Sequence, residues 1–234
     1  WQFERPLLSL QALFFAFAGV ALLAAVAMTV VEEPPATHGQ QDRRPGICGR
    51  VLAAATVWKA PAIWMLGMTN VTFGLASAYV NGFVNGSFAS PSPVLGENSI
   101  GTLLAILSFV AAGCSLIFGR VASPQGKAAL LVLGSCCFMA IPAAVLAVPP
   151  QPSNQYWGAA LVILYVFMGV GRGVYESVNK SVMADFFPGA LSAGAFATGM
   201  MQQAAAFFLC FVLQGVVQRT SLLALMVLIP SAIV

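Results

Sequence analysis

Charged residues are scarce in this chain, which has 10 Lys and Arg, 7 Asp and Glu and 1 His among 234 residues. They make up 7% of the sequence, whereas soluble proteins carry about 25%. Apolar residues supply 59%, and the mean hydropathy is +0.89. A soluble fold of this length cannot bury so much apolar surface. The composition therefore predicts an all-α, polytopic integral membrane protein that has the lipid bilayer as its surroundings.

The sequence also lacks the residue sets that carry several kinds of chemistry. Its 5 cysteines form no CxxC pair, so neither a disulfide framework nor a metal site is predicted, and Cys48 is interpreted as an ordinary thiol rather than a palmitoylation site. No basic tract contains interleaved aromatic residues, which argues against nucleic acid as a partner. The single histidine, His38, lies in a polar stretch, and the apolar runs contain no carboxylate pair or nucleophile–base set. We expect neither an enzyme nor a cofactor.

Long apolar runs dominate the rest of the sequence. A helix needs about 20 apolar residues to cross the hydrocarbon core. Six runs reach this length and a seventh is shorter, and they lie at 7–31, 60–84, 99–118, 128–148, 156–178, 194–217 and 221–234. The chain begins at Trp1 and stops inside the last run, so we expect a fragment of a longer membrane protein.

The connections between the runs alternate in charge. The segments 32–59 and 119–127 carry Lys and Arg, whereas 85–98 and 149–155 carry neither. Strict alternation of spans leaves only Arg5 and Arg219 on one side. On the other side it places Arg43, Arg44, Arg50, Lys59, Arg120, Lys127, Arg172 and Lys180. The positive-inside rule predicts that this second side, with the loop 32–59, is cytoplasmic.

Asn85-Gly86-Ser87 forms an N-glycosylation sequon on the predicted outer side, close to the membrane surface. The sequence leaves its use open. The sequons at Asn70 and Asn179 fall inside a span and on the inner side, respectively, so we expect neither to be modified.

Polar residues recur along the second span. Asn70, Gly74, Ser77 and Asn81 follow helical spacings of four, three and four, so they form one small-and-polar face. Polar groups in hydrocarbon must face protein or water. The face is either the wall of a solute cavity or a seam that packs on a neighbouring helix.

Two adjacent glutamines lie in the sixth span and cannot share a helix face. Gln203 shares one with Phe207, Cys210 and Gln214. We expect one glutamine to face a cavity and the other to bond to a neighbouring helix. Asn70, Ser77, Asn81 and Gln203 are therefore the candidates for a substrate cavity.

Arg172, Glu176 and Lys180 form a charged stripe of alternating sign on the fifth span. If Tyr156 and Trp157 mark the outer interface, a rise of about 1.5 Å per residue puts Glu176 near the inner boundary of the membrane. Gly169 and Gly173 allow another helix to approach closely here.

Three interpretations of the stripe are open. It is a cytoplasmic gate whose charges pair and separate during conformational change, a set of ordinary helix-end charges, or a site where Glu176 binds substrate or a proton. The gate is the interpretation that we favour.

The sequence around the stripe resembles a known family. The block Gly171-Arg172-Gly173-Val174-Tyr175-Glu176-Ser177-Val178-Asn179-Lys180, followed by Ala184-Asp185-Phe186-Phe187-Pro188 and Gly194-Ala195-Phe196-Ala197, is similar to the tenth-to-eleventh helix region of uncoordinated-93-like proteins of the major facilitator superfamily. Residues 73–82 look like the seventh helix of that family.

The resemblance implies that the runs are helices six to twelve of a twelve-helix transporter fold. Residues 1–31 would then end the N-terminal half, 32–59 would be the central cytoplasmic loop, and 60–234 the C-terminal half with its last helix truncated. The signature loop between helices two and three is not in this chain. Its degenerate counterpart, Gly119-Arg120 with Gly126-Lys127, lacks the acidic residue often found there.

Two functions are compatible with this pattern. The first is alternating-access transport of a small solute, in which the missing N-terminal half is the partner. The second is a non-transporting regulator or trafficking partner of a channel or receptor, because members of the family are described in those terms too, and another membrane protein would then be the partner. A seven-helix receptor fits poorly, since no receptor motif is evident and the last run is incomplete.

Overall fold

The computed structural model describes residues 55–121, 126–217 and 219–234, together with isolated positions between Phe15 and Val26, and gives only the backbone of Ala190. The chain divides into two units, Trp1–Arg44 and Pro45–Val234. In the first unit the described positions are helical and fall within the first predicted span. The remainder of 7–31 and the loop residues 32–54, with His38 and Cys48, lie outside the described residues.

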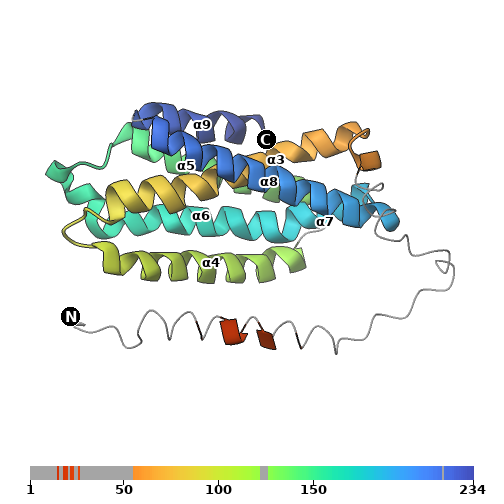
Figure 1. The fold of residues 1–234 in the computed structure, drawn as a ribbon, viewed down its shortest axis with the longest axis horizontal. Helices are drawn as coiled ribbons and strands as arrows, with labels where there is room; N and C mark the ends of the chain where they lie inside the picture. The colour runs from red at the N-terminus through yellow and green to blue at the C-terminus, as the bar shows by residue number, and fades with distance from the viewer. Residues whose placement is uncertain are drawn as a thin grey trace. The chain divides into compact units, whose positions relative to one another are not determined.

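The second unit is a helical bundle in which consecutive membrane-length segments run in opposite directions (Figure 1). Five of its helical segments are long and apolar enough to cross a membrane, namely Pro61–Ala89, Glu97–Val121, Gly126–Ala147, Pro152–Phe186 and Leu191–Val216, and Thr220–Ile233 is a shorter apolar helix. Each overlaps one of the predicted runs from 60–84 onward. The prediction of a helical membrane protein is therefore confirmed.

The first of these segments changes its helical geometry along its length. Helix α3 (Pro61–Ala78) starts with Pro61, whose ring pre-sets the backbone at the first helical position where no hydrogen bond is lost. From Tyr79 to Ala89 the chain continues as a π-helix, η1, with wider turns closed by i→i+5 hydrogen bonds. The segment is thus longer than predicted, and its faces shift in register after Ala78.

The fifth predicted span, 156–178, is wrong at both ends. Gln155, Tyr156 and Trp157 have φ values of 52°, 51° and 65°, so they form a left-handed turn rather than the start of a membrane helix. Regular α-helix begins at α6 (Val162–Val174), passes through the π-helical η4 (Tyr175–Asn179) and continues as α7 (Lys180–Phe186). It stops at Phe187 because Pro188 forces the preceding residue out of the helical region.

The remaining helices are α4 (Ile100–Val121), preceded by the short 3₁₀ turn η2 (Glu97–Ser99), α5 (Gly126–Ala147), α8 (Ala190–Val216) and α9 (Thr220–Ile233). A further 3₁₀ segment, η3 (Pro152–Leu161), contains the left-handed turn. The most extensive contacts join α3 to α8, α4 to α6, and α5 to both α6 and α9. The largest cluster of buried apolar residues lies between these helices and includes Tyr79 and Tyr165, both fully buried.

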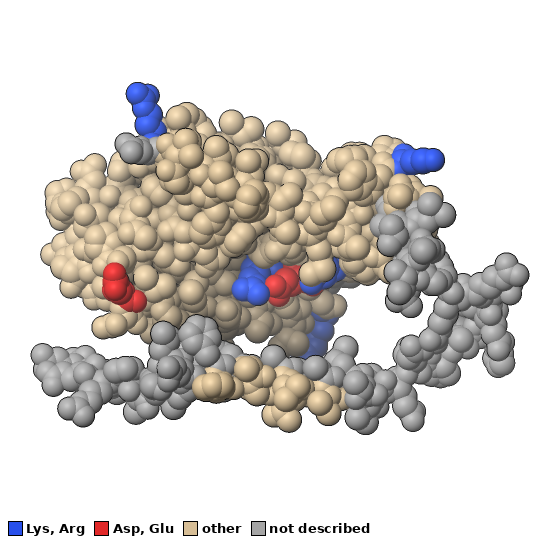
Figure 2. Space-filling model, viewed as in Figure 1, with Lys and Arg blue, Asp and Glu red and all other residues tan. Residues whose placement is uncertain are grey.

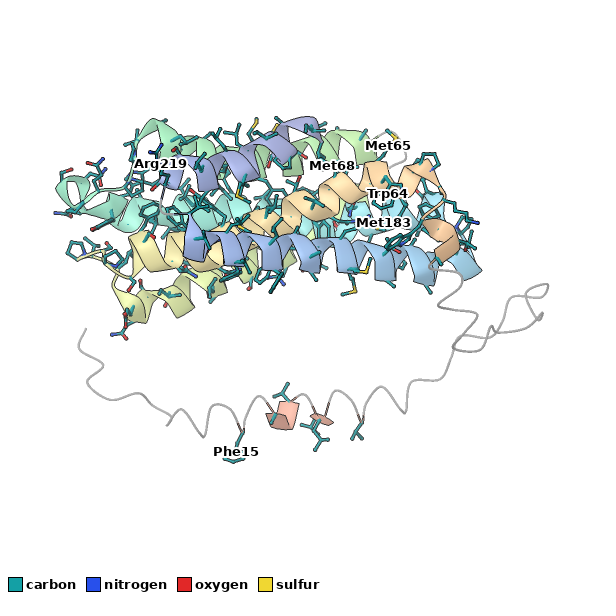
Figure 3. All side chains as sticks on the ribbon, turned by 45° about the horizontal axis from the view of Figure 1, so that its top comes forward. Phe15, Trp64, Met65, Met68, Met183 and Arg219 are labelled. Carbon is teal, nitrogen blue, oxygen red and sulfur yellow. The ribbon has the colours of Figure 1, made fainter. Side chains whose placement is uncertain are left out.

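Two hydrogen bonds show which connections share an end of the bundle. Ser92 Oγ donates to the carbonyl of Gln155 across 3.3 Å, which joins the α3–α4 and α5–α6 connections. At the other end, Trp58 Nε1 donates to Thr198 Oγ1 across 3.2 Å, which joins the approach to α3 to α8. Arg219 lies at the end opposite Trp64 (Figure 3). This placement agrees with the alternation of spans, and the cytoplasmic assignment of the end with Trp58 stays a prediction.

Glycines set the distance between the helices that pack most closely. A Cβ at Gly169 would lie 2.7 Å from the carbonyl oxygen of Leu107, and one at Gly173 would lie 2.7 Å from Cβ of Cys114. The prediction that these two glycines admit a neighbouring helix is confirmed, and that helix is α4. On α3, Gly74 lies directly against the backbone carbonyl of Gln203 on α8.

Much of the outer surface of the bundle is apolar. Phe109 on α4 is 83% exposed and Phe208 on α8 is 70% exposed, and the face shown in Figure 2 carries few charged side chains. Large exposed apolar side chains in such numbers are stable in contact with lipid rather than water.

The contact at Gly74 leads to a stability prediction. In Gly74→Ala, the added methyl group meets backbone atoms of Gln203, which cannot move aside without shifting α8. We expect a loss of about 1–3 kcal/mol of stability, as for other overpacked sites. The thermal-unfolding midpoint of the full-length protein in detergent measures this.

Gly113→Ala on α4 is the matched control, because nothing lies within 4 Å of the added Cβ. Its midpoint should be unchanged or slightly higher. Equal destabilisation by both variants would contradict the assigned α3–α8 contact.

Candidate functional site

An amide network connects three helical elements inside the bundle. Asn179 Nδ2 of η4 donates to Asn70 Oδ1 of α3 across 3.1 Å, and Asn70 Nδ2 donates to Gln202 Oε1 of α8 across 2.8 Å. Thr69 Oγ1 extends the network by donating to Asn179 Oδ1 across 2.9 Å. Asn70 is fully buried, and both ends of its side-chain amide are bonded to other helices.

Two glycines make room for this network. A Cβ at Gly67 would lie 2.9 Å from Gln202 Nε2, and a Cβ at Gly199 would lie 3.0 Å from Asn70 Nδ2. The helices α3 and α8 can therefore approach until their amides meet. Small residues beside interhelical hydrogen bonds are the usual means of helix association in membranes.

A second polar contact lies one residue further along α8. Tyr175 of η4 donates its hydroxyl to Gln203 Oε1 across 3.0 Å, and its ring stacks on Phe73 of α3 with centroids 4.1 Å apart. Gln202 and Gln203 thus both bond to neighbouring helices. The expectation that only one of them does so is wrong. The reason is that Gln202 faces Asn70 of α3, while the long Tyr175 side chain of η4 reaches Gln203.

The four cavity candidates differ in their surroundings. Asn70 and Ser77 are buried and Gln203 is half-buried, whereas Asn81 is exposed. Asn81 departs from the face of Asn70 and Ser77 because it lies beyond the change to π-helical geometry at Tyr79. Asn85 takes a buried position instead. A pattern based on α-helical spacing does not reveal that Asn85 is buried and Asn81 is exposed.

Asn85 and Tyr165 form a buried contact near the opposite end of α6. The Tyr165 hydroxyl donates to Asn85 Oδ1, and Asn85 Nδ2 donates to the carbonyl of Asn81 across 3.0 Å. Asn85 is only 7% exposed. In the sequence this residue stood out only as part of a sequon.

The burial of Asn85 predicts that its sequon is not used. A glycan at Asn85 Nδ2 would need the amide to leave Tyr165 and the π-helix to open. We expect the full-length protein expressed in mammalian cells, with any other sequons removed, to show the same mobility before and after peptide-N-glycosidase treatment. A mobility shift that disappears in Asn85→Gln would contradict the burial.

The charged stripe lies further inside the helix than expected. Counted from Val162, Glu176 is about 21 Å along the segment, and about 15 Å of helix follow it before Phe186. The earlier depth estimate assumed a helix from Tyr156, which the left-handed turn excludes. Glu176 therefore lies well within the helical segment rather than at its end.

Within the stripe, Arg172 and Glu176 form an ion pair. Arg172 Nε donates to Glu176 Oε1 across 2.9 Å, and about 40% of each side chain is exposed, 40% and 38% respectively. Figure 2 shows acidic and basic atoms together in the middle of the viewed face. Lys180 is exposed, and among the described residues it pairs with neither. Their role as a gate stays a prediction.

A further ion pair connects the start of one helix to the end of another. Lys127 Nζ, at the start of α5, lies 2.6 Å from Asp185 Oδ2 in α7. The sequence shows no acidic residue near Lys127. Its partner comes instead from a segment 58 residues away, which spacing does not reveal.

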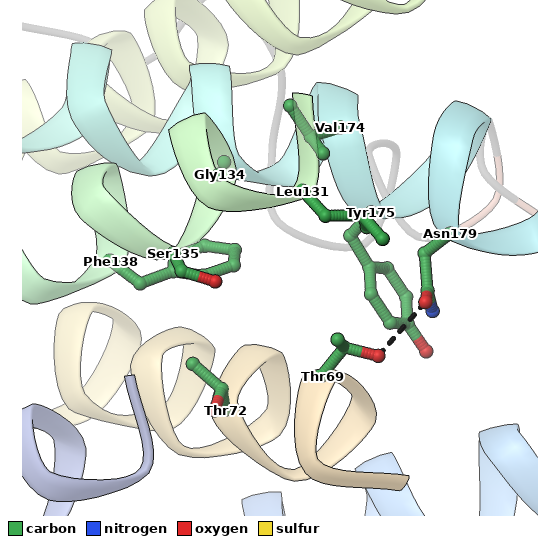
Figure 4. A pocket seen from close by; sticks show the side chains of 10 residues that line it. Thr69, Thr72, Leu131, Gly134, Ser135, Phe138, Val174, Tyr175 and Asn179 are labelled. Carbon is green, nitrogen blue, oxygen red and sulfur yellow. Dashed lines mark hydrogen bonds between the residues drawn. The ribbon is translucent and has the colours of Figure 1, made fainter. Parts of the chain in front are cut away.

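A small cavity adjoins the amide network (Figure 4). It has a volume of about 20 Å³, enough for one water molecule. Thr69 and Thr72 of α3, Ser135 of α5 and Asn179 of η4 supply the polar part of its lining. The Thr72 hydroxyl is buried and has no hydrogen-bond partner in the described part of the chain. One water molecule at this position would satisfy it.

The comparisons with known proteins agree with this architecture. Residues 6–210 match the family model described as Major Facilitator Superfamily. The chain belongs to the major facilitator superfamily. Among curated proteins, it is similar to Protein unc-93 homolog A of Bos taurus, with 24% identity over 202 residues, which cover 83% of this chain and 42% of the relative. No solved structure matches the chain significantly.

The resemblance to uncoordinated-93-like members of the superfamily is thereby confirmed. The chain spans less than half the length of that relative. The numbering of its helices from six to twelve, with 32–59 as a central loop, stays a prediction.

The amide network predicts a difference between two asparagines of the same segment. Asn70→Leu leaves Gln202 Oε1 and Asn179 Nδ2 without a partner, so we expect a loss of about 1–2 kcal/mol of stability. Asn81→Leu removes an exposed amide and should change stability by less than about 0.5 kcal/mol. Thermal unfolding of the full-length variants measures both. A larger loss in Asn81→Leu than in Asn70→Leu would contradict the network.

Proposed function

We propose that this chain is the C-terminal part of a secondary transporter that moves a small solute by alternating access. The amide network around Asn70 carries the proposal, because uncharged hydrogen-bonding groups are concentrated where α3, α8 and η4 meet inside the bundle. Polar groups in such positions mark solute and ion pathways in membrane proteins.

The geometry around the network suits a site that changes its partners. Both α3 and α6 lead into π-helical segments, and π-helical turns are rare and concentrate at functional sites. Gln203 is half-buried and Asn81 is exposed, so these two side chains can reach a solute while Asn70 and Ser77 form the wall behind them. Amide exchange between helix partners and solute would couple binding to movement of α8 against α3.

The remainder of the protein supplies the facing wall in this proposal. A matched relative more than twice as long as the aligned region supports a missing N-terminal half as the partner of this chain. The Arg172–Glu176 pair, with Lys180 beside it, is proposed as the gate on the cytoplasmic side. The positive charges at the end that carries Lys59 and Lys127 support that orientation.

Gradient-driven uptake by the full-length protein tests the proposal. We expect proteoliposomes with an imposed proton or sodium gradient to accumulate at least one member of a labelled solute panel. Gln203→Leu should reduce that uptake about tenfold or more, because it removes a hydrogen-bond partner of the solute. The variant also removes the acceptor of the Tyr175 hydroxyl, so its thermal-unfolding midpoint is measured alongside.

Ser153→Ala is the matched control, since Ser153 is exposed in the connection before α6. Its uptake should equal that of the wild type. Uptake that does not depend on the gradient would reject secondary transport. Uptake that persists when Asn70, Ser77, Asn81 and Gln203 are all replaced would reject the proposed site.

One observation favours a second function. Both ends of the Asn70 amide are occupied by partners within the bundle, as in a purely structural seam. This suits a non-transporting regulator or trafficking partner of another membrane protein. A stable co-purifying channel or receptor, together with no gradient-dependent uptake, would support this function over transport.

A further inference from the structure

Most charged side chains in the described part of the bundle are paired or lie at helix ends. Lys127 pairs with Asp185, and Arg172 pairs with Glu176. The charges in the connections or in a last helical turn are Lys59, Glu97, Arg120 and Arg219. Lys180 differs from all of these, because it lies inside a continuous helical segment and forms no ion pair with any described residue.

The level of Lys180 within the bundle follows from its neighbours. The adjacent residue, Asn179, bonds to Asn70, about 14 Å along α3 from Pro61. Lys180 itself lies about 9 Å before the end of α7. It is therefore set back from the inner ends of both helices. An unpaired charge at such a level is costly unless it has a counter-charge or reaches water.

Lys180 lines a cavity of about 250 Å³ between η4, α7 and α8. The rest of the lining is Tyr175, Met183, Phe196, Gly199 and Met200. Tyr175 already donates its hydroxyl to Gln203. The cavity thus offers one positive charge against walls that are otherwise mainly apolar.

The neighbouring charges do not cancel that of Lys180. Glu176 is engaged by Arg172 at 2.9 Å, so this pair is neutral as a unit. The net charge left beside the cavity is the Lys180 ammonium. A cationic solute would be repelled, and a polyol would find few hydrogen-bond partners on methionine and phenylalanine walls.

We propose that this cavity binds an amphipathic organic anion. The Lys180 ammonium pairs with the acidic head group, and an apolar body lies against Met183, Phe196 and Met200. The head-group pair is a charge-assisted hydrogen bond, and methionine walls adapt to apolar bodies of different shape. The inference deepens the proposed function by naming the class of solute, and it rests on that function only for the claim that the anion is carried across the membrane.

Equilibrium binding to the full-length protein in zwitterionic nanodiscs tests the site without requiring transport. The probes are 3-phenylpropionate, 3-phenylpropanol and 3-phenylpropylamine, which share one apolar body and differ in the charge of the head. We expect saturable binding of the acid and at least about tenfold weaker binding of the alcohol and the amine.

Three variants separate the charge of Lys180 from general charge effects. Lys180→Gln should weaken binding of 3-phenylpropionate about tenfold or more, whereas Lys180→Arg, which keeps the charge, should change it less than about threefold. Lys59→Gln removes one exposed positive charge outside the cavity and should leave binding unchanged.

Several outcomes would overturn the inference. Equal binding of acid and alcohol, or unchanged binding in Lys180→Gln, would show that the charge does not recognise the ligand. Absent binding with a lower unfolding temperature in Lys180→Gln would mean that an acidic residue elsewhere in the protein pairs with Lys180. Competition by phosphatidylglycerol added to the nanodiscs would assign the site to a lipid head group.

Binding and uptake can also fail separately. Anion binding that depends on Lys180 without gradient-driven uptake would keep the site and reject transport. Uptake that is unchanged in Lys180→Gln would keep transport and reject the site.

Discussion

The bundle depends on the rule that an amide buried away from water must have a hydrogen-bond partner. Asn70 meets this rule through Asn179 and Gln202, and each of these partners comes from a different helical element. The contact distances of α3 with α8 and with η4 are therefore fixed by amide geometry, and apolar packing fills the remaining space. Glycines at 67 and 199 are needed because a methyl group at either position would push the amides apart.

Helices approach each other closely at two seams of the bundle, α4–α6 and α3–α8, and these seams differ in the groups that meet. Between α4 and α6, Gly169 and Gly173 admit backbone and small side chains, and Ser115 Oγ of α4 donates to the carbonyl of Gly173 across 3.3 Å. Between α3 and α8, the glycines lie opposite glutamines, so the contact is made by hydrogen bonds. The buried side-chain amides thus lie at the α3–α8 seam, whereas backbone and small side chains meet at the α4–α6 seam.

Hydropathy and charge predicted the helices and their order, because lipid allows only segments that satisfy their own backbone and carry few charges. The family was predicted from the resemblance of the block at 171–197. The Gly169–Gly173 contact also follows from spacing alone. Three features did not follow. The left-handed turn at Gln155–Trp157 contains two aromatic residues and no Gly, Pro or Asn, so the sequence predicted that the membrane helix begins there.

The other two features depend on tertiary structure. The π-helical segments rotate Asn85 inward and Asn81 outward, and helical periodicity assumes a constant turn. The partners of Lys127, Gln202 and Gln203 come from distant parts of the chain, and one sequence carries no record of which residues meet. Of the candidate site, the residue types were predictable, whereas their partners and depths were not.

The Asn70 network consists entirely of amides and a hydroxyl, and none of these groups ionises in the physiological pH range. Acidification therefore does not alter the hydrogen bonds that hold α3, α8 and η4 together. In the described part of the chain, Glu176 is the carboxylate within a helical segment and set back from its ends, since Glu97 and Asp185 lie near helix ends. The Arg172–Glu176 pair lies on the same helical segment as Tyr175 and Asn179, within about 11 Å of both along the axis. One helical segment thus carries a charge pair next to a junction of uncharged groups whose hydrogen bonds do not depend on pH.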